Sequence, residues 1–471
     1  MTELTIHPDR LLPSDPATRA IARSLLGEVE AAPIYSPHGH VDPAWLADNK
    51  PFNDPATLLI TPDHYVTRML HAAGVPLSEL GVSPLNGGAH PADPRDIWRS
   101  FSEKWHLFLG TPVRYWMEQE LNELFGINEQ PDAGNADEIF DTIQTALQTD
   151  EFRPRELFKK FNIAVLATTD DPVDDLSTHR LLRDDPSFTG RVLPTFRPDR
   201  YLDPAAPGWT TALDRLHNVS GIDTSSYAGL LAALKARRQF FKDHGATATD
   251  SGCPEAGTEP LSDPDAQRLH LKALRGQITD REAVAYRRNM LYQMAAMSAE
   301  DGLVMQLHPG IFRNHHRPTF NKFGPDTGHD LPTRTSFVEP LRPLLESFGT
   351  HPNFRMVLFT VDETAFSREI APLAGFYPSV YVGAPWWFLD TPAAISRFRS
   401  AVTDSAGFYK TAGFVDDTRA FCSIPARHNM ARRADAAHLA TLVTTHQITE
   451  TDAHTLARDL VGRIPTDAFR L

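Results

Sequence analysis

Residues 303–308 read Leu-Val-Met-Gln-Leu-His, a short apolar run that ends on a polar residue. A run of this length without regular polar alternation is typical of a strand buried on both faces of a parallel sheet. The stretch before it has the spacing of a helix, with apolar side chains at Ala283, Tyr286, Met290, Leu291, Met294 and Met297. A helix that leads into a buried strand is one unit of an α/β fold.

Similar units recur along the whole chain. Counting the run above, there are eight short apolar runs, at residues 34–38, 162–169, 191–196, 245–250, 303–308, 355–361, 380–384 and 413–417. Buried strands that alternate with helices in this way predict a parallel (β/α)₈ barrel of the TIM type, and a doubly wound sheet is the alternative.

The segment between the first two runs is much longer than one crossover helix needs. Thr61-Pro62 is a helix start signal within it, because threonine caps helices and proline suits the first helical position. We therefore predict a helical insertion at residues 45–160, over the mouth of the barrel. Since α/β barrels often exceed about 250 residues as one unit, we expect residues 1–471 to form a single domain.

The composition narrows the class of function. Lys and Arg total 46 against 60 Asp and Glu, a net charge of −14 that disfavours binding to nucleic acid or to anionic lipid. No apolar run is long enough to span a membrane, and the N-terminus lacks an export segment. Cys253 and Cys422 are too few for a disulfide framework, so we expect a cytoplasmic enzyme. The 20 histidines favour metal or proton chemistry.

A candidate metal site lies at the ends of the first and eighth runs. His38 and His40 are two residues apart, so on a strand their imidazoles point to the same side. Asp417 and Arg419 have the same spacing at the eighth run, where a local ion pair is the alternative interpretation. Because the first and eighth strands of a closed barrel are neighbours, His38, His40 and Asp417 can meet. Two imidazoles and a carboxylate suit one Zn²⁺ or a similar divalent ion.

Longer motifs support a family assignment. They are His38 to Pro43, Asp63 to Tyr65 with Arg68, Phe125 to Ile127, Thr168 to Pro172, Leu193 to Asp199, Met305 to Asn314, Gly324 to Gly328, Trp386 to Phe388, and Asp417 to Phe421 followed by Arg427-His428. In these motifs, in this order, the chain resembles the uronate isomerase (glucuronate isomerase) family of the amidohydrolase superfamily over most of its length.

The resemblance implies an aldose-ketose isomerase of hexuronate catabolism. Its small-molecule partner would be a hexuronate, with D-glucuronate converted to D-fructuronate and D-galacturonate to D-tagaturonate through a cis-enediol. Such a reaction needs a base at carbon 2, a group that stabilises the oxyanion, and a cation for the carboxylate. The resemblance assigns the base to Tyr65 in a dyad with Arg419, since a phenol of pKa about 10 needs a nearby cation to become a phenolate. It also makes Asp417 a metal ligand that shuttles a proton during ring opening.

Several further residues are candidates for contact with the substrate. Arg197 is the first candidate for the substrate carboxylate, because an Arg fork binds carboxylates bidentately, and a surface arginine is the alternative. Arg313 is a second candidate. His64 would bind a sugar hydroxyl or be structural, and His308 would be a metal ligand, a substrate contact or structural. Trp386 and Trp387 would wall the pocket or only pack.

One departure from the family pattern concerns the fourth run. There Asp250 is followed by Ser251 and Gly252, where the family usually has a histidine after the aspartate. Neither Ser251 nor Gly252 carries the imidazole that this contact requires.

Two other classes of function compete with isomerisation. A mononuclear metal-dependent hydrolase or deaminase of the same superfamily is the closest. Members of the superfamily with two metal ions generally need a Lys or Glu on the fourth strand that bridges the ions and a histidine on the sixth strand. The fourth and sixth runs of this chain have neither, which favours one metal ion per site. A sugar-acid binding protein without activity is the other. Barrels of this size often associate, so a homo-oligomer is a candidate state.

Overall fold

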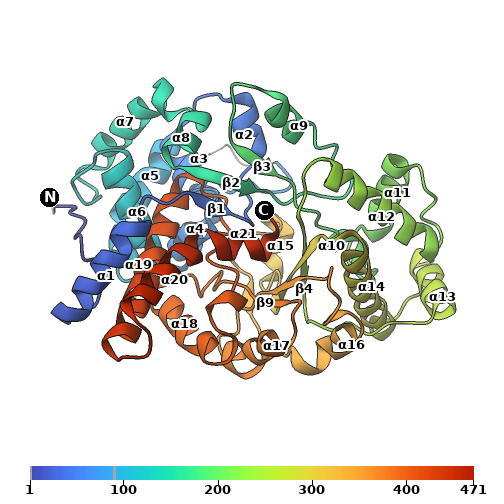
Figure 1. The fold of residues 1–471 in the computed structure, drawn as a ribbon. Coiled ribbons are helices and arrows are strands. Elements are labelled where there is room, and N and C mark those ends of the chain that lie inside the picture. The colour runs from blue at the N-terminus through green and yellow to red at the C-terminus, as the bar shows by residue number, and fades with distance from the viewer. Residues whose placement is uncertain (1–2, 88–91) are drawn as a thin grey trace.

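Seven of the eight predicted runs form strands in the computed structural model, which describes residues 3–87 and 92–471. The strands are β1 Ile34–Ser36, β2 Ile163–Ala167, β3 Arg191–Leu193, β4 Ala248–Cys253, β5 Val304–Pro309, β8 Met356–Leu358 and β9 Val380–Val382. They pair in parallel as β1-β2-β3 and as β4-β5-β8-β9, in the middle of the molecule (Figure 1). The remaining two strands, β6 Ile311–Phe312 and β7 Leu331–Pro332, make a short antiparallel pair that follows β5.

Hydrogen bonds outside the ladders connect the two sheets into a ring. At one junction the Phe196 carbonyl, just beyond β3, accepts from the Asp250 amide of β4 at 2.9 Å. At the other junction the Ala412 amide donates to the Val382 carbonyl of β9 at 2.9 Å, and the His40 amide donates to the Thr418 carbonyl at 3.0 Å. The ring has the order of a (β/α)₈ barrel, as the sequence predicted.

The eighth run, residues 413–417, is not a strand. Gly413 and Asp417 have φ values of +77° and +42°, which break the extended backbone that a ladder requires. The segment nevertheless occupies the place between β9 and β1. The fourth run is displaced by three residues, because Gly245 (φ +95°) still belongs to the turn after helix α12 Tyr227–Asp243. Asp250 consequently lies in the middle of β4.

Helices cover the outside of the ring. Those associated with the strands and the C-terminus are α9 Ser177–Asp184, α10 Asp199–Leu202, α11 Trp209–Ser220, α12, α13 Asp263–Leu274, α14 Asp280–Asp301, α15 Arg317–Phe323, α16 Val338–Phe348, α17 Ala371–Phe376, α18 Pro392–Ala406, α19 Ile424–Thr444, α20 Glu450–Val461 and α21 Arg463–Phe469. Short helical turns are η5 Phe366–Ile370, η6 Phe408–Lys410 and η7 Phe421–Ser423. Near the N-terminus, α1 Pro16–Val29 packs on α19 and α20.

The segment after β1 is helical, as predicted. It contains α2 Pro43–Asp48, α3 Pro55–Leu59, α4 His64–Ala72, α5 Pro94–Glu103, α6 Pro112–Gln119, α7 Ala136–Leu147 and α8 Pro154–Lys160, with short turns η1 Leu77–Leu80, η2 Trp105–Phe108, η3 Glu120–Leu124 and η4 Asp150–Phe152. Its buried side chains, Trp98 and Trp116 among them, share one apolar cluster with barrel residues such as Val304. This shared core supports the single-domain organisation, which stays a prediction.

One helix start was predicted too early. Helix α4 begins at His64, and its N-cap is Asp63, whose carboxylate accepts from the Tyr65 amide at 2.8 Å. Thr61 does not cap this helix, because its hydroxyl donates to the Leu80 carbonyl at 3.0 Å.

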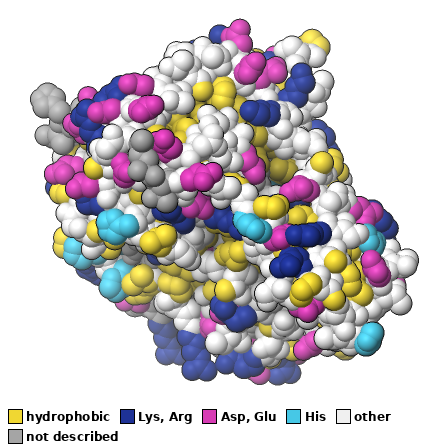
Figure 2. All heavy atoms as spheres, turned by 90° about the vertical axis from the view of Figure 1, so that its left-hand side faces the viewer, with side chains coloured by type: hydrophobic (Ala, Val, Ile, Leu, Met, Phe, Trp, Pro, Cys, Tyr) yellow, Lys and Arg dark blue, Asp and Glu magenta, His cyan; other side chains and the backbone are white. Residues whose placement is uncertain are grey.

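The surface carries mixed charge. On the face that contains the left-hand side of Figure 1, acidic and basic side chains are interspersed, with a basic group along the lower edge of the view (Figure 2). The net charge of −14 therefore does not make this face uniformly acidic. Among the described residues, none of the helices combines the length and apolarity that crossing a membrane requires. Cys253 and Cys422 are both buried and free.

The strand period decides which residues of β5 reach the barrel interior. Met305 and Leu307 belong to the apolar cluster between the strands and the helices, whereas Val304 belongs to the cluster on the other side. His308, next in alternation after Val304 and Gln306, is thereby directed to the inside.

We predict that Leu307→Ala lowers the free energy of unfolding by about 2–5 kcal/mol, because it leaves a cavity at a fully buried position. The matched control is Leu181→Ala on α9, where the leucine is 65% exposed and we expect a change within about 0.5 kcal/mol. Urea denaturation followed by circular dichroism measures both. Equal losses in the two variants would contradict the assignment of Leu307 to the core.

Candidate functional site

A cavity of about 710 Å³ lies where the strands end, beside the first turn of α4. Every residue predicted for the site lines it: His38, His40, His64, Tyr65, Arg197, His308, Arg313, Trp386, Trp387, Asp417 and Arg419. The volume is in the range of pockets that hold small molecules. The barrel thus brings together side chains that are up to 381 positions apart in the chain (Arg419 and His38, 419 − 38).

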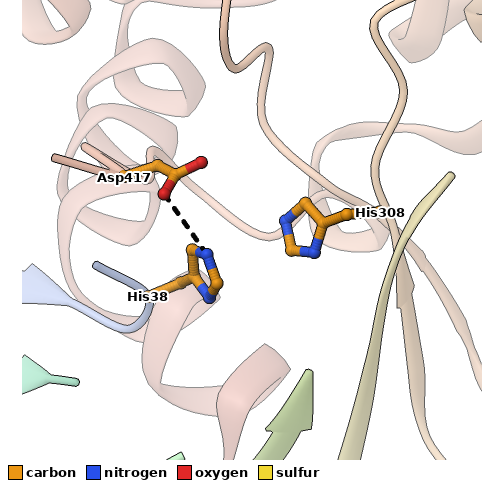
Figure 3. Close-up of side chains that lie close together, drawn as sticks. All are labelled: His38, His308 and Asp417. Carbon is orange, nitrogen blue, oxygen red and sulfur yellow. Dashed lines mark ion pairs between the residues drawn. The ribbon is translucent and has the colours of Figure 1, made fainter. Parts of the chain in front are cut away.

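Asp417 is the centre of a group of metal-ligand side chains. Its Oδ1 lies 3.3 Å from His38 Nε2 and 3.1 Å from His40 Nε2. His38, His308 and Asp417 each offer a ligand atom, and these atoms all lie within 4.8 Å of one another. Figure 3 shows the three side chains pointing toward one another, with one ring nitrogen of His308 facing the other two residues. His308, whose role the sequence left open, therefore belongs to this group.

The group fits a divalent cation. His308 Nδ1 is bonded to the buried Asp250 Oδ1 at 2.6 Å, so the ring nitrogen that faces Asp417 is Nε2, which is buried without a hydrogen-bond partner. A carboxylate that fixes the far nitrogen of a histidine is the usual support of a metal-ligating imidazole. An unpaired buried nitrogen is costly, and a cation would satisfy it.

The charges of the group also suit a cation. Burial raises the pKa of Asp417, but His38 and His40 lower it by more, so the pKa lies well below its usual range. Burial lowers the pKa values of His40 and His308. Burial also lowers the pKa of His38, but Asp417 and Asp250 raise it by more, so the pKa of His38 lies above its usual value. At neutral pH the site therefore presents a carboxylate and, at His40 and His308, neutral imidazoles, the forms that bind metal.

Arg197 is fixed by two carboxylates. Its Nη1 lies 3.0 Å from Asp250 Oδ2 and its Nε donates to Asp199 Oδ2 at 2.8 Å. A Cβ at Gly252 would approach Arg197 Nη2 to 2.8 Å, so the glycine makes room for the guanidinium. The departure from the family motif at Ser251 and Gly252 thus accompanies an arginine that occupies this space.

Tyr65 has a different partner from the one predicted. Its hydroxyl lies 3.0 Å from both carboxylate oxygens of Asp390, and the Arg427 guanidinium carbon lies 5.4 Å from its ring centroid. Arg419 instead donates to Asp326 at 2.9 Å. The predicted direct dyad of Tyr65 and Arg419 is therefore not formed, because a carboxylate on the loop 324–328 holds the arginine at the rim of the cavity.

Sequence reasoning missed Asp390 and gave Arg427 no role. Arg427 stood in a recognised motif, and its position beside the site was the available signal. Asp390 follows the aromatic motif by two residues, but no spacing rule connects it with Tyr65, 325 positions away.

Aromatic rings form one wall of the cavity. The Trp386 ring lies 4.6 Å from the His308 ring in an edge-to-face arrangement, and Trp387 lies 5.2 Å from His64. The His64 ring stacks on Tyr65 at 5.0 Å, and burial lowers its pKa to about 4. Arg313 lies over the Trp387 ring at 5.0 Å and donates to Asp330 at 2.8 Å. Trp386 and Trp387 line the cavity together with His64 and Arg313, and their packing against a sugar stays a prediction.

Comparison with known proteins gives a consistent result. The family model described as glucuronate isomerase matches residues 15–465. A uronate isomerase of Corynebacterium efficiens is 51% identical over 471 residues, covering 100% of both chains. The crystal structure of glucuronate isomerase from Caulobacter crescentus superposes with a TM-score of 0.97 at 47% identity, over 100% of this chain and 98% of the other. Uronate isomerase from Thermotoga maritima superposes with a TM-score of 0.91 at 30% identity, over 99% of each chain.

We predict that His308→Gln loses the bound divalent metal, because it removes the imidazole with the unpartnered nitrogen. The matched control is His270→Gln, which removes a buried histidine bonded to Tyr286 and Thr224 outside the cavity and should leave the metal content unchanged. Elemental analysis of the folded, soluble variants measures both. A full metal complement in His308→Gln would exclude His308 from the ligand set.

Proposed function

Because the chain belongs to the glucuronate isomerase family, we propose that its cavity binds a hexuronate and moves a proton from carbon 2 to carbon 1. This interconverts D-glucuronate and D-fructuronate, and D-galacturonate and D-tagaturonate, through a cis-enediol. The observation that carries the proposal is the convergence on one cavity of a metal-ligand group, a buried tyrosine and five arginines. A hydrolase or deaminase is not favoured, since the full-length relatives are isomerases.

His38, His40, His308 and Asp417 are proposed to hold one divalent cation, with Zn²⁺ suited to their donor set. When bound, such an ion supplies Lewis acidity toward oxygen groups of the substrate. Burial raises the pKa of Asp417, but His38 and His40 lower it by more, so Asp417 is ionised before the reaction. It is the proposed shuttle for opening the sugar ring at the hydroxyl of carbon 5.

Tyr65 is the proposed base at carbon 2. It lines the cavity in the first turn of α4, where the helix N-terminus favours negative charge on a nearby oxygen. Burial raises the pKa of Tyr65 well above its usual value, and Asp390 adds to the rise while Arg427 opposes it. Tyr65 is therefore a phenol before the reaction and must lose its own proton while it accepts another.

Local cations are proposed to bind the substrate carboxylate, which the net charge of the chain would otherwise repel. Arg197 is the first candidate: it is charged, because its carboxylate neighbours raise its pKa against the effect of burial, and it is rigidly held. Arg313 and Arg419 also line the cavity and share Asp326, which neutralises part of their charge. His64 would contact a sugar hydroxyl, and Trp386 and Trp387 would pack on the apolar face of the sugar. Cytoplasmic location and assembly into a homo-oligomer stay predictions.

We predict that the purified, metal-loaded protein converts each uronate to its ketose in deuterated water. Tyr65→Phe should lower kcat at least about 100-fold, because it removes the base, while calorimetry still detects uronate binding. Carbon NMR of the products measures ketose formation by the wild type and by Tyr65→Phe. Absence of ketose from either uronate would exclude the proposed reaction.

We further predict that Arg197→Lys raises KM about 10- to 100-fold, because a lysine cannot reproduce the charge-assisted fork on a carboxylate. Arg183→Lys on the exposed face of α9 is the matched control and should behave as wild type. Steady-state kinetics on D-glucuronate compare the two. An unchanged KM in Arg197→Lys would assign the carboxylate to other cations.

A further inference from the structure

Beside the Tyr65 hydroxyl lies a buried carboxylate, Asp390, that the reaction as described does not use. The Asp390 side chain is 4% exposed, and both of its oxygens lie 3.0 Å from the Tyr65 hydroxyl. It does not line the cavity, whereas Tyr65 and Arg427 do. Asp390 therefore has access to the reacting atoms only through the tyrosine.

Asp390 is itself held from behind by Arg427 on α19. Arg427 Nη1 donates to Asp390 Oδ2 at 3.1 Å, and its Nε donates to Ser423 at 2.9 Å. The guanidinium also lies 3.6 Å from the centroid of the Trp116 ring. Since Arg427 is 1% exposed and cannot lose its proton, it is a fixed positive charge that keeps Asp390 oriented.

The circuit closes on the helix that carries Tyr65. Asp63, the N-cap of α4, accepts from the Tyr65 amide at 2.8 Å and lies 3.8 Å from Arg427 Nη2. The backbone and the hydroxyl of Tyr65 are thus both connected to the same arginine through one carboxylate each. Such a network holds the Tyr65 ring in one position. Within it, Asp390 is the group that accepts the hydrogen bond of the phenol.

We propose that Asp390 positions Tyr65 and accepts the phenolic proton of Tyr65 as Tyr65 removes the proton from carbon 2. The arrangement places a carboxylate behind a neutral hydroxyl, so that the hydroxyl oxygen can act as a base without a free phenolate in the resting enzyme. This inference rests on the proposed function of Tyr65 and adds the residue that makes a phenol usable as a base.

The proton transfers balance. The C2–H bond breaks, its electrons form the double bond between carbons 1 and 2, and the aldehyde oxygen gains the negative charge. The carbon-bound proton goes to Tyr65, whose own proton goes to Asp390. Within the cis-enediolate the proton of the carbon 2 hydroxyl passes to the oxygen of carbon 1. Tyr65 then protonates carbon 1, the carbonyl forms at carbon 2, and Asp390 returns its proton to Tyr65.

The charges around Asp390 suit a proton acceptor. Burial raises its pKa, Arg427 opposes the rise, and Asp417 adds to it, so the carboxylate binds a proton more readily than one in water. The other charged groups that face this network are Asp63 and Asp416 toward Arg427, the buried Glu120 toward Arg427, and Arg68 over the Tyr65 ring at 5.8 Å. None of these bonds to the Tyr65 hydroxyl among the hydrogen bonds of the described residues, which leaves Asp390 as its acceptor.

The test compares Asp390→Asn with wild type as metal-loaded enzymes on D-glucuronate. Asparagine keeps the shape and can accept a hydrogen bond but not the proton. We expect kcat to fall about 100-fold at neutral pH with KM within about threefold, the size of a lost acid-base step. Activity should recover as the pH is raised, because solvent then removes the phenolic proton. If Asp390→Asn only disturbed the structure, its activity would not recover as the pH is raised.

A second readout does not depend on turnover. Loss of the Asp390 charge beside an unchanged Arg427 should lower the pKa of Tyr65, so its phenolate absorbance near 295 nm should appear at lower pH than in wild type. Tyr65→Phe in each background identifies the signal of Tyr65. The matched control is Asp435→Asn, which breaks another buried Asp-Arg pair, with Arg399, away from the cavity. It should keep wild-type kcat and pH dependence per folded molecule.

The outcomes separate the two proposals. Wild-type kcat in Asp390→Asn, or loss of activity at all pH values with an unchanged titration of Tyr65, would overturn the role of Asp390. If wild type itself forms no ketose, the proposed function fails, whatever the titration shows. A loss at neutral pH that recovers with pH, together with earlier ionisation of Tyr65, supports the relay.

Discussion

The site depends on the junction between the first and eighth segments of the barrel. There the His40 amide donates to the Thr418 carbonyl, although the eighth segment has no regular strand. This contact places the His38 and His40 imidazoles beside Asp417 and puts Arg419 at the rim of the same cavity. The positive φ of Asp417 bends the backbone at this point, so the carboxylate lies inward between the two histidines. Without closure of the ring, the ligand group would be divided between the two ends of the chain.

The charges buried around the cavity occur in compensated sets. Asp250 joins His308 to Arg197, and Asp390 joins Tyr65 to Arg427, so each carboxylate supports a group that lines the cavity. A buried ion pair is costly unless its remaining hydrogen bonds are satisfied. Both oxygens of Asp390 accept hydrogen bonds, whereas Asp250 Oδ2 has only the ion pair with Arg197. The result is a pocket lined by individual arginines and aspartates together. Net charge therefore describes the surface of this chain and says little about what the pocket binds.

Much of this arrangement was predictable from the sequence. Apolar runs gave seven of the strands, since burial on both faces leaves a clear pattern, and the spacing of His38 and His40 gave two neighbours of Asp417. The prediction of a strand at residues 413–417 was wrong, because Gly413 and Asp417 adopt positive φ values that the pattern of apolar residues does not reveal. The pairing of Tyr65 with Arg419 was wrong as a direct contact, because Asp326 competes for the arginine.

The sequence by itself determined the class of fold, the residue types at the strand ends and the family. These follow from local rules, namely strand periodicity, the two-residue repeat of a strand and ordered motifs. Only the tertiary structure decided which groups are partners. It places His308 in the metal-ligand group with Asp417, so this histidine is more than a structural residue, and it pairs Asp390 with the Tyr65 hydroxyl. These partnerships join residues 109 (417 − 308) and 325 positions apart. Their geometry depends on where the helices and loops around the barrel come to rest, and one sequence records no spacing for that.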